Sequence, residues 1–89
     1  MSTPVHATIA SRVGLHARPV SVFTRAVKAT GIPVTIGRPG KDAVNAASPL
    51  MVLSLGIVQG DSVVLASEAP DADGHLHELA QLLETELDA

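Results

Sequence analysis

Short apolar segments alternate along the sequence between strand spacing and helix spacing, and this alternation constrains the fold more than any other feature. β-Branched and alternating residues predict four strands, at residues 5–10, 33–38, 41–46 and 61–67. Pro39 and Gly40 lie between the second and third of these, and the pair is typical of a type II turn. The second and third strands are therefore expected to form a hairpin.

Helical spacing fills the gaps between the expected strands. One helix is predicted from Pro19 to a stop at Gly31, and a short second helix from Ser48 to Gly56. The third closes the chain after residue 70, and its apolar positions form one stripe: Leu76, Leu79, Leu83 and Leu87.

The resulting order, β-α-β-β-α-β-α, must fit into 89 residues. We therefore expect a single domain over residues 1–89 of the α+β class, an open-faced β-sandwich. Its four-stranded, mainly antiparallel sheet would carry three helices on one face. Hydrophobic residues make up 46% of the chain and Phe23 is its one aromatic residue, so the core must be aliphatic.

Several classes of site and location are disfavoured by composition. The chain has no cysteine, which excludes disulfides, cysteine zinc sites and thiol nucleophiles. His75 and His77 are two residues apart in an expected helix and do not face each other, so no metal site is predicted. No signal peptide or membrane-spanning segment is expected. We expect a cytoplasmic monomer with no cofactor, no nucleic-acid partner and no membrane insertion.

Charge is unevenly distributed along the chain. All six lysines and arginines lie in the first 41 positions, and all nine acidic residues follow them. Such a split predicts a field that steers acidic partners toward one face, unless folding mixes the two halves.

The stretch GLHARP, residues 14–19, combines groups suited to binding an anion. His16 stands at or just before the first turn of an expected helix, where backbone N–H groups have no partner within the helix. Arg18 adds a planar cation suited to phosphate oxygens, and the neutral imidazole of His16 is a competent nucleophile. The residues alone leave two interpretations open: a phosphoryl acceptor at His16, or a helix-capping histidine beside a solvated arginine.

GLHARP resembles the active-site signature of the HPr family, the histidine-containing phosphocarriers of the phosphoenolpyruvate-dependent sugar phosphotransferase system. The stretch NAASPLMVLSLG, residues 45–56, is similar to the second signature of that family. The resemblance implies a phosphoryl carrier rather than an enzyme: Enzyme I phosphorylates His16 at Nδ1, and IIA domains of sugar permeases receive the group. It also implies that Arg18 and the backbone N–H groups of Ala17 and Arg18 hold the phosphate.

The resemblance further implies a docking surface for Enzyme I and IIA domains. The matching residues are Val20, Leu50, Met51, Leu53 and Ser54. Core packing is the competing interpretation for Val20 and Leu53. A different class of function also stays open: a regulatory binding module that contacts regulatory proteins through this patch, with phosphorylation as a switch and no onward transfer.

Two positions depart from the family pattern. Ser48 matches a serine that a kinase phosphorylates in some bacteria, but the Pro49 that follows is unusual there, and Ser48 is also a predicted N-cap. Val13 stands where many members have a small polar residue, so its side chain cannot hydrogen-bond a phosphate.

Overall fold

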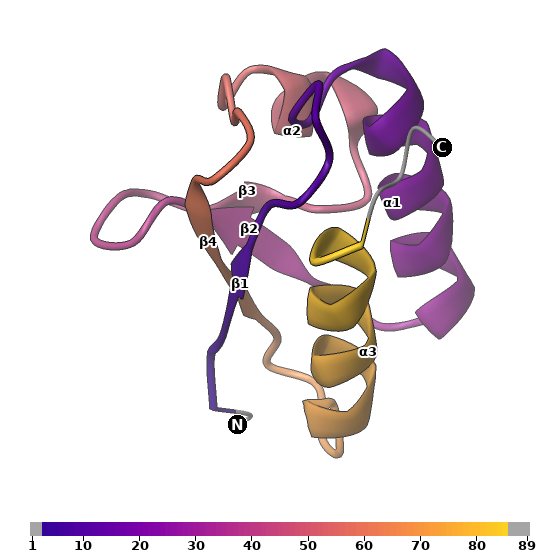
Figure 1. Ribbon diagram of the computed structural model, residues 1–89. Coiled ribbons are helices and arrows are strands. Elements are labelled where there is room, and N and C mark those ends of the chain that lie inside the picture. The colour runs from indigo at the N-terminus through magenta and orange to yellow at the C-terminus, as the bar shows by residue number, and fades with distance from the viewer. Residues whose placement is uncertain (1–2, 86–89) are drawn as a thin grey trace.

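A computed structural model describes residues 3–85 and shows the expected order of strands and helices (Figure 1). The strands are β1 (Val5–Thr8), β2 (Thr35–Gly37), β3 (Val44–Asn45) and β4 (Ser62–Ala66). The helices are α1 (Ala17–Thr30), α2 (Pro49–Leu53) and α3 (Asp73–Leu83).

The four strands form one antiparallel sheet in the order β1-β4-β2-β3. The helices lie on one side of this sheet, with α1 beside α3 and the short α2 near one end (Figure 1). Alternation along the strands follows this arrangement: Ala7, Ile36 and Leu65 are buried, while His6 and Thr35 are exposed. The open-faced α+β sandwich expected from the sequence is therefore confirmed.

The core is aliphatic, as the composition predicts. Phe23 is fully buried in this core, and the predicted stripe of α3 contributes Leu76, Leu79 and Leu83. Leu87, the fourth residue of that stripe, lies outside the described residues. The predicted turn is also present: Gly40 has a φ of 76°, and the N–H of Lys41 donates to the carbonyl oxygen of Arg38 at 3.0 Å.

Several predicted boundaries are wrong by a few residues. Helix α1 begins at Ala17, two residues before Pro19, because a proline in the first turn lacks only an N–H that has no acceptor within the helix. Strand β3 is limited to Val44–Asn45 because the chain before it belongs to the exposed turn. Helix α2 ends at Leu53, and Gly56, with a φ of 63°, lies in the loop beyond it.

Candidate functional site

The loop before α1 fixes the position of His16. The backbone N–H of Leu15 donates to the carbonyl oxygen of Ile57 at 3.0 Å, and the Leu15 side chain is buried. Gly14 has a φ of 67°, and a Cβ there would stand 2.5 Å from that oxygen and 2.7 Å from Cα of Val58. Glycine is therefore required at position 14 both by the backbone angle and by the close approach of the second loop.

His16 is the N-cap residue of α1. Its backbone is extended, with φ −93° and ψ −169°, and its carbonyl oxygen accepts the N–H of Val20 at 2.8 Å. The imidazole makes no capping hydrogen bond and is exposed, so His16 occupies the N-cap position, as one interpretation predicts, without using its ring as a cap. A nucleophilic ring nitrogen is consequently left accessible beside the start of the helix.

The start of α1 is electrostatically suited to an anion. The N–H groups of Ala17 and Arg18 occupy the first two helical positions, which have no acceptor within the helix. The first turn carries no acidic side chain that could neutralise the positive end of the helix dipole. A phosphoryl group bound near His16 would therefore meet oriented N–H donors.

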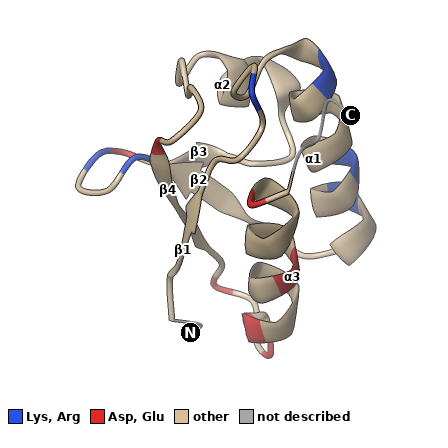
Figure 2. Ribbon diagram, viewed as in Figure 1, with Lys and Arg blue, Asp and Glu red and all other residues tan. Residues whose placement is uncertain are grey.

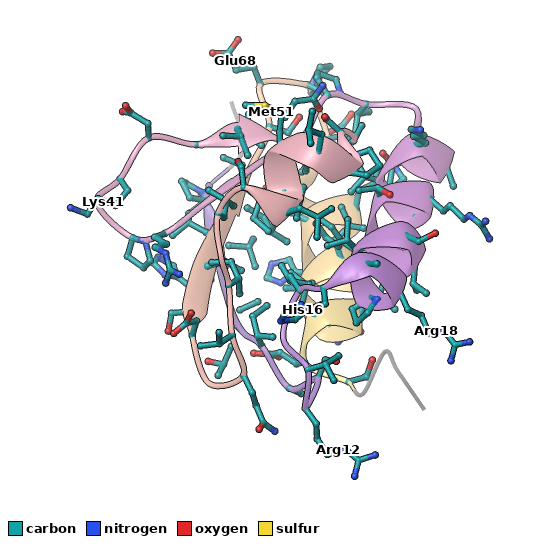
Figure 3. The ribbon with its side chains drawn as sticks, turned by 90° about the horizontal axis from the view of Figure 1, so that it is seen from above. Arg12, His16, Arg18, Lys41, Met51 and Glu68 are labelled. Atoms are coloured by element: carbon teal, nitrogen blue, oxygen red, sulfur yellow. The ribbon has the colours of Figure 1, made fainter. Side chains whose placement is uncertain are left out.

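An open depression in the surface adjoins the imidazole. Its lining residues come from the loop before α1, from the first turn of α1 and from the loop before β4: Arg12, Val13, His16, Ala17, Arg18, Pro19, Val58 and Gln59. Arg12 and Arg18 are exposed, and both side chains extend away from the ring of His16 (Figure 3). For Arg18 to bind a phosphate on His16, its side chain must turn back toward the ring.

The residues predicted to contact partners fall into two groups. Leu50, Met51 and Leu53 of α2 are 76%, 42% and 40% exposed, and Ser54 follows them at the surface. Val20 is only 1% exposed, because it lies on the same side of α1 as Phe23 and packs into the core. The prediction of Val20 as a contact residue is therefore wrong, and Val20 packs in the core, as the competing interpretation has it. For Leu53 the competing interpretation is wrong, because its side chain is exposed.

Two exposed apolar residues near His16 were not predicted as site residues. Val13 is 42% exposed and Val58 is 53% exposed, and both line the depression. The sequence distinguishes Val13 only by its lack of a polar group. Val58 lies about 40 positions from His16 in the sequence and carries no local signal, so only the folded chain brings it to the site.

Ser48 caps α2 as predicted. Its hydroxyl oxygen accepts the backbone N–H of Met51 at 3.3 Å, and Pro49 occupies the first helical position. The side chain of Ser54 closes the other end by donating to the carbonyl oxygen of Met51 at 2.5 Å. The apolar residues of α2 are thus presented on a short helix that is capped by side chains at both ends.

Most basic residues lie apart from most acidic residues in the folded chain, but some of the two kinds are brought together (Figure 2). Basic residues are spread along α1, and acidic residues lie on α3 and in the loop before it. Arg38 and Asp61, from opposite halves of the sequence, form a salt bridge of 3.0 Å. Arg18, Arg25 and Lys28 thus lie together on α1, and the steering of acidic partners toward this face stays a prediction.

Within residues 3–85, no group of three or more histidines or acidic residues is placed to hold a metal ion. In the same part of the chain, none of the helices has the length and apolar character needed to cross a membrane.

The sequence matches a family model and is similar to characterised proteins. Residues 5–85 match the family model described as the PTS HPr component phosphorylation site. The chain is 54% identical over 70 residues to the phosphocarrier protein HPr of Streptomyces coelicolor, covering 79% of this chain and 75% of that protein. It is 39% identical over 79 residues to the phosphocarrier protein HPr of Haloferax volcanii, covering 88% and 89%.

Solved structures agree with these matches. The fold is similar to that of HPr from Thermoanaerobacter tengcongensis, with a TM-score of 0.83 and 28% identity over 99% of this chain and 98% of that one. It is also similar to the phosphocarrier protein HPr of Bacillus anthracis, with a TM-score of 0.82 and 28% identity over 91% and 95%.

Proposed function

The chain belongs to the HPr family of phosphocarrier proteins, and from this premise we propose that it accepts a phosphoryl group from phospho-Enzyme I on His16 and passes it to IIA domains of sugar permeases. The observation that carries the proposal is the position of His16. Its ring is exposed and makes no capping bond, while its backbone begins a helix whose N-terminus suits an anion.

The chemistry asks little of the protein beyond positioning and charge stabilisation. The lone pair of Nδ1 of the neutral imidazole attacks phosphorus, a P–N bond forms, and the bond from phosphorus to the donor breaks. Onward transfer reverses these events: an acceptor on the IIA domain attacks phosphorus and the imidazole leaves. The protein therefore acts as a carrier and performs no net reaction on a substrate of its own.

The N–H groups of Ala17 and Arg18 supply the donors for the phosphoryl oxygens in this proposal. They lie at the first two positions of α1, immediately after His16 in the chain. The guanidinium of Arg18, turned toward the ring, adds a charged donor during transfer. A neutral imidazole carries a lone pair and no proton on the attacking nitrogen, so attack by this form needs no general base.

Docking is assigned to the exposed apolar residues of α2, which are Leu50, Met51 and Leu53, together with Ser54. Apolar side chains this exposed on a small domain are suited to burial against a partner. Enzyme I and the IIA domains would use the same surface in turn, since both must reach His16. We place this relay in the cytoplasm, where phosphoenolpyruvate, its phosphoryl source, is made.

A relay assay tests the proposal against the regulatory alternative. The protein is phosphorylated with Enzyme I and phosphoenolpyruvate, separated from both, and mixed with a panel of purified IIA domains. A carrier transfers its phosphoryl group to at least one of them. A regulatory module that only switches partner binding would keep the group, and that result would reject the carrier assignment.

A further inference from the structure

The loop between α2 and β4 supports the loop that carries His16. The carbonyl oxygen of Ile57 accepts the N–H of Leu15, and Gly14 packs directly on the backbone of Ile57 and Val58. Gln59 adds a third tie, because its Nε2 donates to the carbonyl oxygen of Ala10 at 3.1 Å. The loop that carries His16 is therefore held against residues 56–60, which we call the support loop.

One carboxylate oxygen adds a side-chain bond to the support loop, which backbone bonds also hold. Oδ2 of Asp61 accepts the backbone N–H of Val58 at 2.9 Å and a bond from Nη1 of Arg38 at 3.0 Å. The second guanidinium nitrogen of Arg38, Nη2, donates to the carbonyl oxygens of Leu55 and Gly56 at 3.2 and 3.0 Å. Asp61 and Arg38 thus tie together the support loop, the end of α2 and the turn after β2.

We infer that Asp61 is a positioning residue for His16, acting through Val58 and the support loop, with Arg38 as its charged partner. The inference rests on the proposed function of His16 and adds residues that neither touch the imidazole nor lie on the docking helix. Phosphoryl transfer is sensitive to such positioning, because small errors in the alignment of reacting atoms cost large factors in rate.

The contacts predict which kinetic quantity changes. The docking residues of α2 lie outside the hydrogen bonds that Asp61 makes, so the affinity for Enzyme I should be retained when Asp61 is replaced. What changes is the alignment of the imidazole and of the first N–H groups of α1 with the incoming phosphorus. Replacing Asp61 should therefore lower the maximal transfer rate and leave the half-saturating concentration unchanged.

The test is single-turnover rapid-quench transfer from phospho-Enzyme I at varied concentrations of the carrier. Asp61→Ala removes both bonds of the carboxylate, and we expect its maximal rate to fall about tenfold at an unchanged half-saturating concentration. Asp61→Asn keeps an oxygen that can accept from Val58 and should recover most of the rate. Arg38→Met leaves the bond between Asp61 and Val58 in place, so its maximal rate should fall less than that of Asp61→Ala.

Glu68→Ala is the matched control. Glu68 is an exposed carboxylate just past the end of β4, at the opposite end of the sheet from the support loop. The Glu68→Ala protein should therefore accept the phosphoryl group at the wild-type rate. The inference is overturned if Asp61→Ala transfers within about twofold of wild type, if Glu68→Ala loses as much, or if only the half-saturating concentration rises.

Backbone amide NMR signals of His16, Ala17 and Arg18 provide a readout that does not depend on phosphorylation. They should move in Asp61→Ala and stay in place in Glu68→Ala. If wild-type protein accepts no phosphoryl group, the proposed function fails, and unchanged signals in Asp61→Ala would separately overturn the positioning role. If Asp61→Ala does not fold, Arg38→Met decides the question, because a wild-type rate together with unmoved amide signals in that variant would contradict the positioning role of the pair.

Discussion

Gly14 and Ile57 are in direct backbone contact: a Cβ at position 14 would stand 2.5 Å from the Ile57 carbonyl oxygen. That oxygen is also the acceptor for the N–H of Leu15, the residue immediately before His16. The segment that carries the histidine and the support loop are thus fitted to each other through main-chain atoms. A side chain at position 14 would disrupt this contact.

Gly14→Ala should therefore destabilise the fold more than an alanine at another glycine with positive φ. Gly31, with a φ of 73° and nothing within 4 Å of an added Cβ, is the matched position. We expect Gly31→Ala to lower the free energy of unfolding by about 1 kcal/mol through backbone strain, and Gly14→Ala by about 3 kcal/mol because overpacking is added. Urea denaturation measures the free energy of unfolding of both variants. Equal decreases in Gly14→Ala and Gly31→Ala would contradict the close contact at Gly14.

Val20 and Leu50 should separate stability from docking. Val20→Ala removes buried methyl groups and should lower the free energy of unfolding by about 2 kcal/mol. Leu50→Ala changes an exposed side chain, so its stability should stay within about 0.5 kcal/mol of wild type, while the half-saturating concentration for phospho-Enzyme I rises. A Leu50→Ala protein that transfers with wild-type kinetics at every concentration would remove α2 from the docking surface.

Ser48→Ala should lower the free energy of unfolding by about 1 kcal/mol, because the N–H of Met51 loses the hydroxyl acceptor. Ser62→Ala, at an exposed position of β4, is the control and should change stability by less than about 0.5 kcal/mol. Thermal and urea unfolding of both variants provide the comparison. A Ser48→Ala protein as stable as wild type would mean that the bond seen at the start of α2 contributes nothing to folding.

Asp61 should make the stability of the fold depend on acid pH. The backbone N–H of Val58, and after it the guanidinium of Arg38, hold the pKa of Asp61 below its ordinary value of 3.8. A carboxylate with a lower pKa in the folded state stabilises the fold above the unfolded pKa, and this contribution is lost as pH falls through the folded pKa.

The comparison that isolates this effect is wild type against Asp61→Asn, which cannot titrate at this position. The advantage of wild type in urea midpoint should be full near pH 6 and should shrink as pH falls below about 4. If the difference in urea midpoint between the two proteins stayed constant from about pH 6 to below about pH 4, the role assigned to the Asp61 charge would be contradicted.

Local signals in the sequence were sufficient for most of the fold. Pro39 and Gly40 form the predicted turn, and Ser48 caps the predicted helix, because each depends on residues only a few positions away. The sequence predicts the start of α1 two residues too late, because proline favours the first helical position. A proline is equally acceptable at the third position, since its missing N–H has no acceptor there.

The site itself was predicted only where its residues are neighbours in the chain. His16, Ala17 and Arg18 are consecutive, and helix physics brings their imidazole and N–H groups together. The prediction for Val20 was wrong because family likeness assigned it to the surface while its spacing with Phe23 places it in the core. The contribution of Asp61 combines a local bond from Val58 with a bond from Arg38, which lies 23 residues away, and no pattern in the sequence indicates that second bond.

The central claim is tested most directly by intact-mass measurement after incubation with Enzyme I and phosphoenolpyruvate. Wild-type protein should gain one acid-labile phosphoryl group, and His77→Ala, which alters an exposed histidine on α3, should gain the same. His16→Ala should gain none while keeping the wild-type fold. A His16→Ala protein phosphorylated to the same extent as wild type, or a wild-type protein that is not phosphorylated at all, would contradict the account.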